Sequence, residues 1–263
     1  MPNAKLRQMY SAMLRLRLLH QHSVARKARS GRKGGSALFG LEACLISPVI
    51  DLAPNDLVCD TLDSDVLDSG PAATPNAKRK RLQSDLPPTR LIGPTSGPER
   101  LWTALGAAAA LRANGLRTGT REGSVLVCYA RPEDASPSIW AKVLTQIFAH
   151  RLPLLLVTLP ASKSTGSRTG RMSALAVRNH VPGIPVDQHD AVALFRASQE
   201  AIGHARLGGG GALIECVRYV VEGKKLPASD PLEILAQYML VRNVADHNWL
   251  RAEAKSLAKS SRA

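Results

Sequence analysis

The hydrophobic positions of residues 123–160 predict one strand–helix–strand unit, and the remaining chain can be arranged around it. Residues 124–129 and 154–159 are short, continuous apolar runs bounded by turn residues, which is typical of buried strands. Ser136 and Pro137 indicate a helix start, because Ser accepts from free amides and Pro loses no hydrogen bond at the first helical position. The apolar residues that follow fall on one helical face: Ile139, Trp140, Val143, Leu144, Ile147 and Phe148.

Two buried strands joined by a helix run parallel, and this geometry predicts where a ligand would bind. Parallel sheets of this kind bind ligands at the carboxyl ends of their strands. We therefore expect any small-molecule site at residues 130–135 and 160–170.

The same reasoning predicts alternating helices and strands along the rest of the chain. Helices are expected over residues 4–29, 39–50 (disturbed at Pro48), 99–114 (ending at Asn114 and Gly115), 171–179 and 190–206, from residue 230 onwards, and over 246–260. Short strands are expected at residues 57–59, 181–186 and 212–221. This alternation predicts one α/β domain over residues 1–263, with a mainly parallel sheet.

Two segments of this domain depart from the pattern. Residues 1–36 form a basic N-terminal helix and loop, and residues 60–98 form an irregular insert with six prolines. The insert contains the basic run at residues 78–81, K-R-K-R, which fits a nuclear signal or a phosphate contact. We interpret it as a solvated linker, because nothing around it would order it.

Charge narrows the choice of partners. The net charge of +14 favours an acidic partner, such as nucleic acid, an anionic membrane surface or an acidic protein. The basic residues are spread along the chain without a nucleic-acid-binding motif, so we favour a basic, solvated surface over nucleic-acid binding. No run reaches the ~20 apolar residues that a membrane span needs, so no membrane association is expected.

The cysteines and histidines show no metal-binding spacing. Cys44, Cys59, Cys128 and Cys216 are far apart in the sequence, and we predict reduced, buried thiols in a cytoplasmic protein. His189 lies in a polar turn and is expected to face solvent.

Five motifs follow one another in a recognisable order. They are Y-S-A-M-L-R-L-R at 10–17, G-L-E-A at 40–43, L-A-P-N-D at 52–56, V-P-G with V-D-Q-H-D at 181–190, and G-A-L-I-E-C-V-R-Y at 211–219. Together they resemble the alpha subunit of thiamine-diphosphate-dependent 2-oxoacid dehydrogenases, the decarboxylating component of pyruvate, branched-chain and acetoin dehydrogenase complexes. The resemblance implies a three-layer thiamine-diphosphate-binding fold with helices on both faces of the sheet. It also implies an oxidoreductase that decarboxylates a 2-oxoacid with thiamine diphosphate and magnesium, together with a beta subunit in a heterotetramer-like assembly.

The cofactor motifs of that family are missing. In the family the central strand ends in G-D-G, whose Asp binds magnesium, and the next strand ends in N-N, whose Asn completes the metal site. Here the corresponding residues are 129–132, Y-A-R-P, and 159–161, L-P-A. Residues 59–63 lack the family's R-x-H phosphate contact, and G-K-K at 223–225 replaces a G-H-S loop. We therefore carry no catalytic residue over and expect impaired or absent catalysis.

Two weaker candidate sites lie in the same loops. A shift of one or two residues would place Glu133 or Asp134 as a magnesium ligand, whereas their ordinary role is favourable charge before a helix N-terminus. If the loops converge as in the family, Arg131, Lys224 and Lys225 form an anion site that needs no metal. Otherwise these three cations face water.

Three functional hypotheses remain open from the sequence. The chain is a dehydrogenase alpha subunit with impaired chemistry, a non-catalytic scaffold or regulator that pairs with a beta subunit, or a basic protein that binds nucleic acid or another anion.

Overall fold

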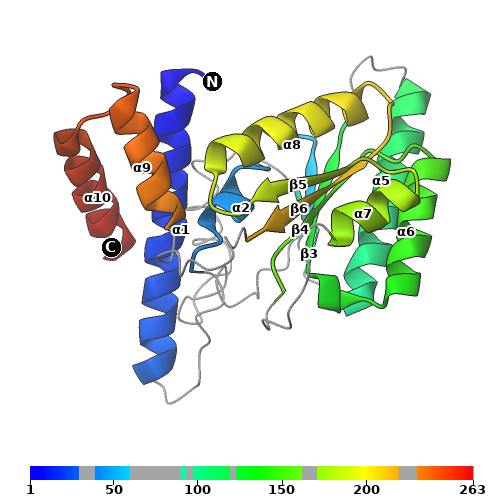
Figure 1. Ribbon diagram of the computed structural model, residues 1–263, viewed down its shortest axis with the longest axis horizontal. Coiled ribbons are helices and arrows are strands. Elements are labelled where there is room, and N and C mark those ends of the chain that lie inside the picture. Colours follow the sequence, from blue (N-terminus) through cyan, green and yellow to red (C-terminus); the bar gives the residue numbers. More distant parts are fainter. Residues whose placement is uncertain are drawn as a thin grey trace, which may run out of the picture.

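A six-stranded sheet forms the centre of the molecule (Figure 1). The computed structural model describes residues 1–29, 39–59, 90–92, 97–118, 123–161, 171–218 and 230–262. The strands are β1 (Leu57–Cys59), β2 (Arg90–Ile92), β3 (Leu126–Ala130), β4 (Leu154–Thr158), β5 (Gly183–Asp187) and β6 (Ala212–Val217). They lie in the order β2-β1-β3-β4-β6-β5, and every pair of neighbours is parallel. The predicted mainly parallel sheet is confirmed.

Helices alternate with these strands, as the sequence predicts. They are α1 (Asn3–Arg29), α2 (Glu42–Ile46), α5 (Gly97–Thr118), α6 (Pro137–Ala149), α7 (Arg171–Arg178), α8 (Ala191–Arg206), α9 (Pro231–Val241) and α10 (His247–Arg262). A short 3₁₀ turn, η1 (Pro132–Asp134), separates β3 from α6. Within the described ranges, no helix is long and apolar enough to cross a bilayer.

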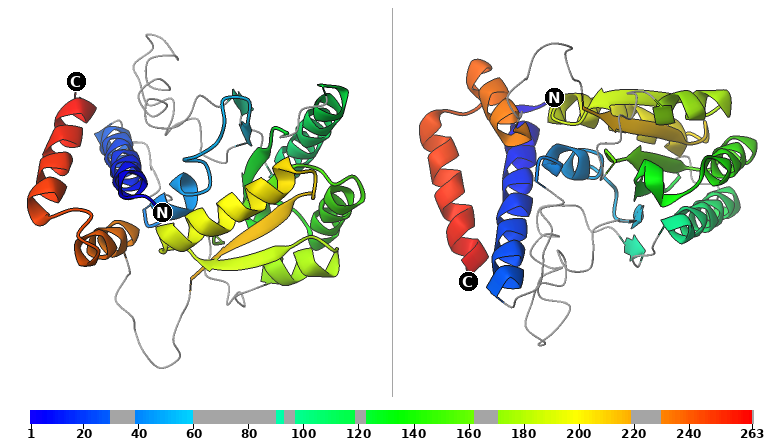
Figure 2. Two further views of the ribbon diagram at one scale, coloured as in Figure 1. Left: turned by 90° about the horizontal axis from the view of Figure 1, so that it is seen from above. Right: turned by 60° about the horizontal axis from the view of Figure 1, so that its bottom comes forward.

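Alternate side chains of the central strands β3, β4 and β6 enter two different hydrophobic cores. On β3, Val127 and Tyr129 pack in the core shared with α1, α2, α8 and α9. Leu126, Cys128 and Ala130 point to the opposite face, where α5, α6 and α7 cover the sheet. Strand residues alternate sides in this way because the backbone is pleated. The result is a three-layer α/β arrangement with helices on both faces (Figures 1 and 2).

The N-terminal helix packs against the protein's own core. Leu6, Met9, Met13 and Leu16, the positions that recur at helical spacing, are almost completely buried. Helix α1 contacts α2, α9 and α10, and α1, α9 and α10 form a separate group beside the sheet (Figure 2). The N-terminal helix α1 and the C-terminal helix α10 therefore pack against each other.

Several sequence predictions need correction. Helix α5 continues past Asn114 and Gly115 to Thr118, and the helix expected over residues 39–50 is only the five-residue α2. Phe148 is 52% exposed and contacts the His180 ring, so it does not join the buried face of α6. The 60–98 segment contains strand β2, which pairs with β1. The rest of that segment up to residue 96, including its basic run at 78–81, lies outside the described residues.

A buried ion pair fixes the amino-terminal end of the sheet. The Asp56 carboxylate is fully buried and accepts from the Val125 amide (2.9 Å), the Ala53 amide (2.6 Å) and the Arg206 guanidinium. Asp56 precedes β1, Val125 precedes β3, and Arg206 ends α8. One carboxylate thus positions three elements that are distant in the sequence.

A second arginine joins helix α1 to α2 and to the start of α9. Arg17 of α1 donates to Glu42 at 2.8 Å and to Asp230 at 2.5 Å. Asp230 also caps α9 by accepting from the Leu232 amide at 2.8 Å. Burial alone would raise the pKa of Asp230, but the hydrogen bonds from Arg17 and the Leu232 amide outweigh burial and hold this pKa below its ordinary value of 3.8.

Removing the buried carboxylate should destabilise the protein strongly. We expect Asp56→Ala to lower the free energy of unfolding by about 3–5 kcal/mol, because Arg206 and two amides lose their acceptor. Asp51→Ala removes the surface partner of Lys5 and is the matched control, expected to cost less than about 1 kcal/mol. Urea unfolding measures both values. Equal effects of the two substitutions would contradict the role given to Asp56.

The Asp230 carboxylate should make the free energy of unfolding depend on pH in the acidic range. Its pKa is lower in the folded than in the unfolded protein, so its contribution is present above about 3.8 and is lost as the pH falls through the folded-state pKa. Wild type should therefore exceed Asp230→Asn in free energy of unfolding at pH 7, and the gap should shrink below pH 3.8. Urea unfolding at several pH values tests this. A gap that stays constant down to pH 2 would show that the carboxylate charge is not involved.

Candidate functional site

The candidate site is the sheet edge where β3 and β4 end. Ala130 pairs with Thr158 in the parallel ladder, so the two carboxyl ends lie side by side. The Leu159 amide donates to the Ala130 carbonyl at 2.9 Å and extends the pairing by one residue. The two strand ends therefore lie side by side, as the sequence predicts, and a ligand at this edge stays a prediction. The part of the second loop at residues 162–170 lies outside the described residues.

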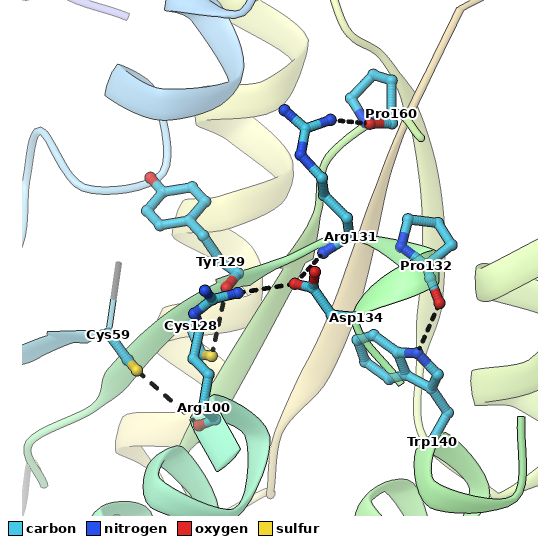
Figure 3. A network of polar contacts seen from close by, with 9 residues as sticks. All are labelled: Cys59, Arg100, Cys128, Tyr129, Arg131, Pro132, Asp134, Trp140 and Pro160. Atoms are coloured by element: carbon cyan, nitrogen blue, oxygen red, sulfur yellow. Dashed lines mark hydrogen bonds and ion pairs between the residues drawn. The ribbon is translucent and has the colours of Figure 1, made fainter. Parts of the chain in front are cut away.

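Helix α6 anchors the loop that follows β3. Ser136 caps α6 by accepting from the Ile139 amide, and Pro137 occupies the first helical turn, as predicted. The indole of Trp140, which is 1% exposed, donates to the Pro132 carbonyl at 3.1 Å. The turn η1 is thus fixed to the first turn of the helix that follows it (Figure 3).

Arg131 connects the two strand ends. Its guanidinium donates to the carbonyl of Pro160, just beyond β4. Its backbone amide donates to Asp134 at 2.8 Å. Arg131 is therefore held at both its backbone and its side chain, and the guanidinium reaches from one strand end to the next (Figure 3).

Asp134, one of the two candidate metal ligands, is already engaged by two donors. The same oxygen that accepts from the Arg131 amide also accepts from Arg100 of α5 at 2.7 Å. Arg100 is only 8% exposed, so this ion pair lies within the protein. Glu133, the other candidate, lies on the exposed side of η1. The structure brings Asp134 and Arg131 together through the hydrogen bond from the Arg131 backbone amide to the Asp134 carboxylate.

The predicted anion site is only partly visible. Arg131 lies at the expected strand end, whereas Lys224 and Lys225 are outside the described residues. Their convergence with Arg131 remains a prediction. Within the described part of the chain, the nearest charged neighbours of Arg131 in the network are Asp134 and, through it, Arg100.

Two thiols lie beneath this network. Cys59 and Cys128 are register partners on neighbouring strands, and both are fully buried. The hydrogen bond with Cys59 and burial raise the pKa of the Cys128 thiol well above its usual range. Burial and the contact with Cys216 do the same to the pKa of Cys44. Because the thiolate is the reactive form of cysteine, the raised pKa values of Cys44 and Cys128 argue against a nucleophilic role for them. The prediction of free, buried thiols is confirmed for all four cysteines.

Sequence reasoning missed two polar groups at the same edge. Glu215 of β6 is the register neighbour of Thr158, is 8% exposed, and accepts from the Ser173 amide in the first turn of α7 at 2.8 Å. His189 is 8% exposed and contacts Asp187 at 3.1 Å, so the expectation that it faces solvent is wrong. The apolar neighbours of Glu215 in G-A-L-I-E-C were the available signal for its burial.

These residues do not fit a magnesium ion and a diphosphate. Magnesium requires several oxygen ligands in near-octahedral geometry. At this edge the carboxylate of Asp134 accepts two hydrogen bonds, the Pro160 carbonyl accepts from a cation, and Ala161 has no side-chain oxygen. Among the described residues, no group of three or more His, Cys, Asp or Glu side chains is placed to hold a metal. A helix N-terminus that could face phosphate, that of α7, already has the Glu215 carboxylate.

Comparisons with known proteins place this edge in context. A family model described as "Dehydrogenase E1 component" matches residues 158–226. The pyruvate dehydrogenase E1 component subunit alpha of Staphylococcus aureus is 29% identical over 136 residues, which cover 49% of this chain and 35% of that subunit. The chain resembles such alpha subunits, as its motifs predict. The alpha subunit of acetoin:2,6-dichlorophenolindophenol oxidoreductase from Bacillus subtilis is 48% identical over 44 residues, 17% of this alpha-subunit-like chain and 13% of the relative.

The fold also has a match among solved structures. A transketolase variant from Pichia stipitis superposes with a TM-score of 0.54 and 13% sequence identity, over 97% of this chain and 44% of the transketolase. The predicted thiamine-diphosphate-binding fold is confirmed. The alpha-subunit-like chain matches only about a third of the length of its pyruvate dehydrogenase relative, at 35%.

The Arg100–Asp134 pair should be energetically coupled. We expect Asp134→Ala to lower the free energy of unfolding by about 2–4 kcal/mol, because it leaves Arg100 buried without its carboxylate. Arg100→Met combined with Asp134→Ala should cost clearly less than the sum of the single substitutions. Urea unfolding of the four proteins measures this coupling, and strictly additive effects would contradict it.

Proposed function

We propose that this chain is a non-catalytic paralogue of the 2-oxoacid dehydrogenase alpha subunit that scaffolds or regulates a complex by pairing with a beta subunit. One observation carries the proposal: hydrogen bonds and a cation occupy the carboxyl ends of β3 and β4, where the resembled family keeps its metal. Asp134 and the Pro160 carbonyl, two of the oxygens at this edge, already accept from Arg100 and Arg131, and Glu133 is the exposed carboxylate beside them. The fold and its motifs support common ancestry with the alpha subunits, while this edge argues against their chemistry.

The chain's own residues support a structural role at this edge. Arg131 orients the loop after β3 and ties it to β4, and Trp140 holds the same loop from the other side. Glu215 orients the start of α7. These groups hold segments in place through internal hydrogen bonds, which supports a structural role here rather than proton transfer to a 2-oxoacid, the substrate class of the resembled family.

The partner proposal rests on the resemblance. The relatives are named as alpha subunits, and a chain that keeps their fold but not their metal site can keep their assembly surface. The net charge of +14 favours an acidic partner surface.

A second candidate, binding to nucleic acid, follows from the same charge. It predicts affinity for generic duplex DNA that falls steeply as salt rises. Absence of binding at low salt would eliminate it.

The deciding experiment is calorimetric titration with thiamine diphosphate, with and without magnesium. We expect no saturable heat for this chain, either alone or with a beta subunit encoded beside it. The paired alpha and beta subunits of the Staphylococcus aureus pyruvate dehydrogenase are the positive control. Magnesium-dependent binding to this chain would overturn the proposal, and co-elution with the beta subunit in size-exclusion chromatography would support the assembly role.

A further inference from the structure

The carboxyl ends of two neighbouring parallel strands present carbonyl oxygens toward the same region. The pairing ends with the hydrogen bond from the Leu159 amide to the Ala130 carbonyl, and within the described residues no strand amide donates to the Pro160 carbonyl. It accepts instead from the Arg131 guanidinium, which begins on the neighbouring strand end. A hydrogen bond from a charged donor is stronger than one from a neutral amide. The Arg131 side chain therefore adds a charged contact to the hydrogen bond between the Leu159 amide and the Ala130 carbonyl, which joins the same two ends.

The position of Arg131 is itself fixed by charge. Asp134 binds its backbone amide at 2.8 Å, and Asp134 is held in turn by Arg100 at 2.7 Å. Four segments are joined in this way: α5, the end of β3, the turn η1 and the end of β4 (Figure 3). The guanidinium is thus presented by a pre-organised loop.

The oxygens at this edge are largely engaged by internal donors. One oxygen of Asp134 accepts two hydrogen bonds, from the Arg131 amide and from Arg100. Arg100 and Arg131 together offset the charges of Glu133 and Asp134, so these four residues carry no net charge that would attract a cation. A divalent ion would have to break the Arg131 contact to reach the Pro160 carbonyl.

We infer that the Arg131 guanidinium is a built-in cation that replaces a metal ion in holding the ends of β3 and β4 together, so that this edge is closed and independent of metal. The inference rests on the proposed function, because it explains how an alpha-subunit-like chain keeps its strand ends in place without the family's ion. It adds a positioning role for one residue and a test that does not involve thiamine diphosphate.

The test is hydrogen exchange of the full chain, wild type and Arg131→Ala, followed by mass spectrometry. In Arg131→Ala, exchange at residues 131–136 and 159–161 should become about tenfold faster, the factor expected for losing one charge-assisted hydrogen bond. Exchange in α8 and β6 should stay unchanged. Arg251→Ala removes the same charge from the exposed face of α10 and is the matched control.

Two further measurements complete the test. Arg131→Lys keeps a cation on a shorter donor and should recover part of the protection. Wild type should show the same exchange and the same thermal midpoint in EDTA and in millimolar magnesium. The inference is overturned if Arg131→Ala behaves like Arg251→Ala, or if magnesium protects the strand ends of wild type. Neither result depends on whether thiamine diphosphate binds, so failure here and failure of the proposed function are separable.

Discussion

One carboxylate oxygen of Asp134 accepts from two arginines, from the backbone of Arg131 and from the side chain of Arg100. The geometry of the sheet edge depends on this sharing. Without it, Arg100 would be a buried charge without a counter-ion, which is strongly unfavourable. The loop after β3 would also lose the contact that sets the direction of the Arg131 side chain. The same carboxylate oxygen therefore stabilises both a buried arginine and the loop after β3.

The motifs that carry the family resemblance in this chain contain charged residues that hold the fold. Asp56 of L-A-P-N-D is the fully buried partner of Arg206, and Glu42 of G-L-E-A pairs with Arg17 from the first motif. Asp190 of V-D-Q-H-D caps α8 by accepting from two amides, at 3.0 and 2.9 Å. Glu215 of the last motif caps α7. Each of these carboxylates accepts hydrogen bonds that hold the fold, so its loss would cost folding free energy directly. This cost gives a physical reason for these motifs to be kept independently of the cofactor motifs.

Sequence patterns predicted the long elements well and the short ones less well. The β3–α6–β4 unit and α8 have continuous periodicity together with a capping residue, so local signals and packing agree. The stop expected at Asn114 and Gly115 failed because α5 continues for one more turn, against the local preference of those residues. Strand β2 has three residues inside a proline-rich segment, and only its pairing with β1 identifies it.

The candidate site shows the same division between local and long-range information. Arg131 could be singled out from the sequence because a motif position places it at a strand end. Its partners could not be identified, since Arg100 lies 31 positions earlier and Pro160 contributes a backbone carbonyl that no residue type reveals. A substitution of a metal ligand by arginine is thus ambiguous in a sequence, because the guanidinium could bind an anion or an internal carbonyl. In this fold the internal carbonyl is the observed partner, because the parallel pairing ends just before Pro160 and the Arg131 guanidinium donates to its carbonyl.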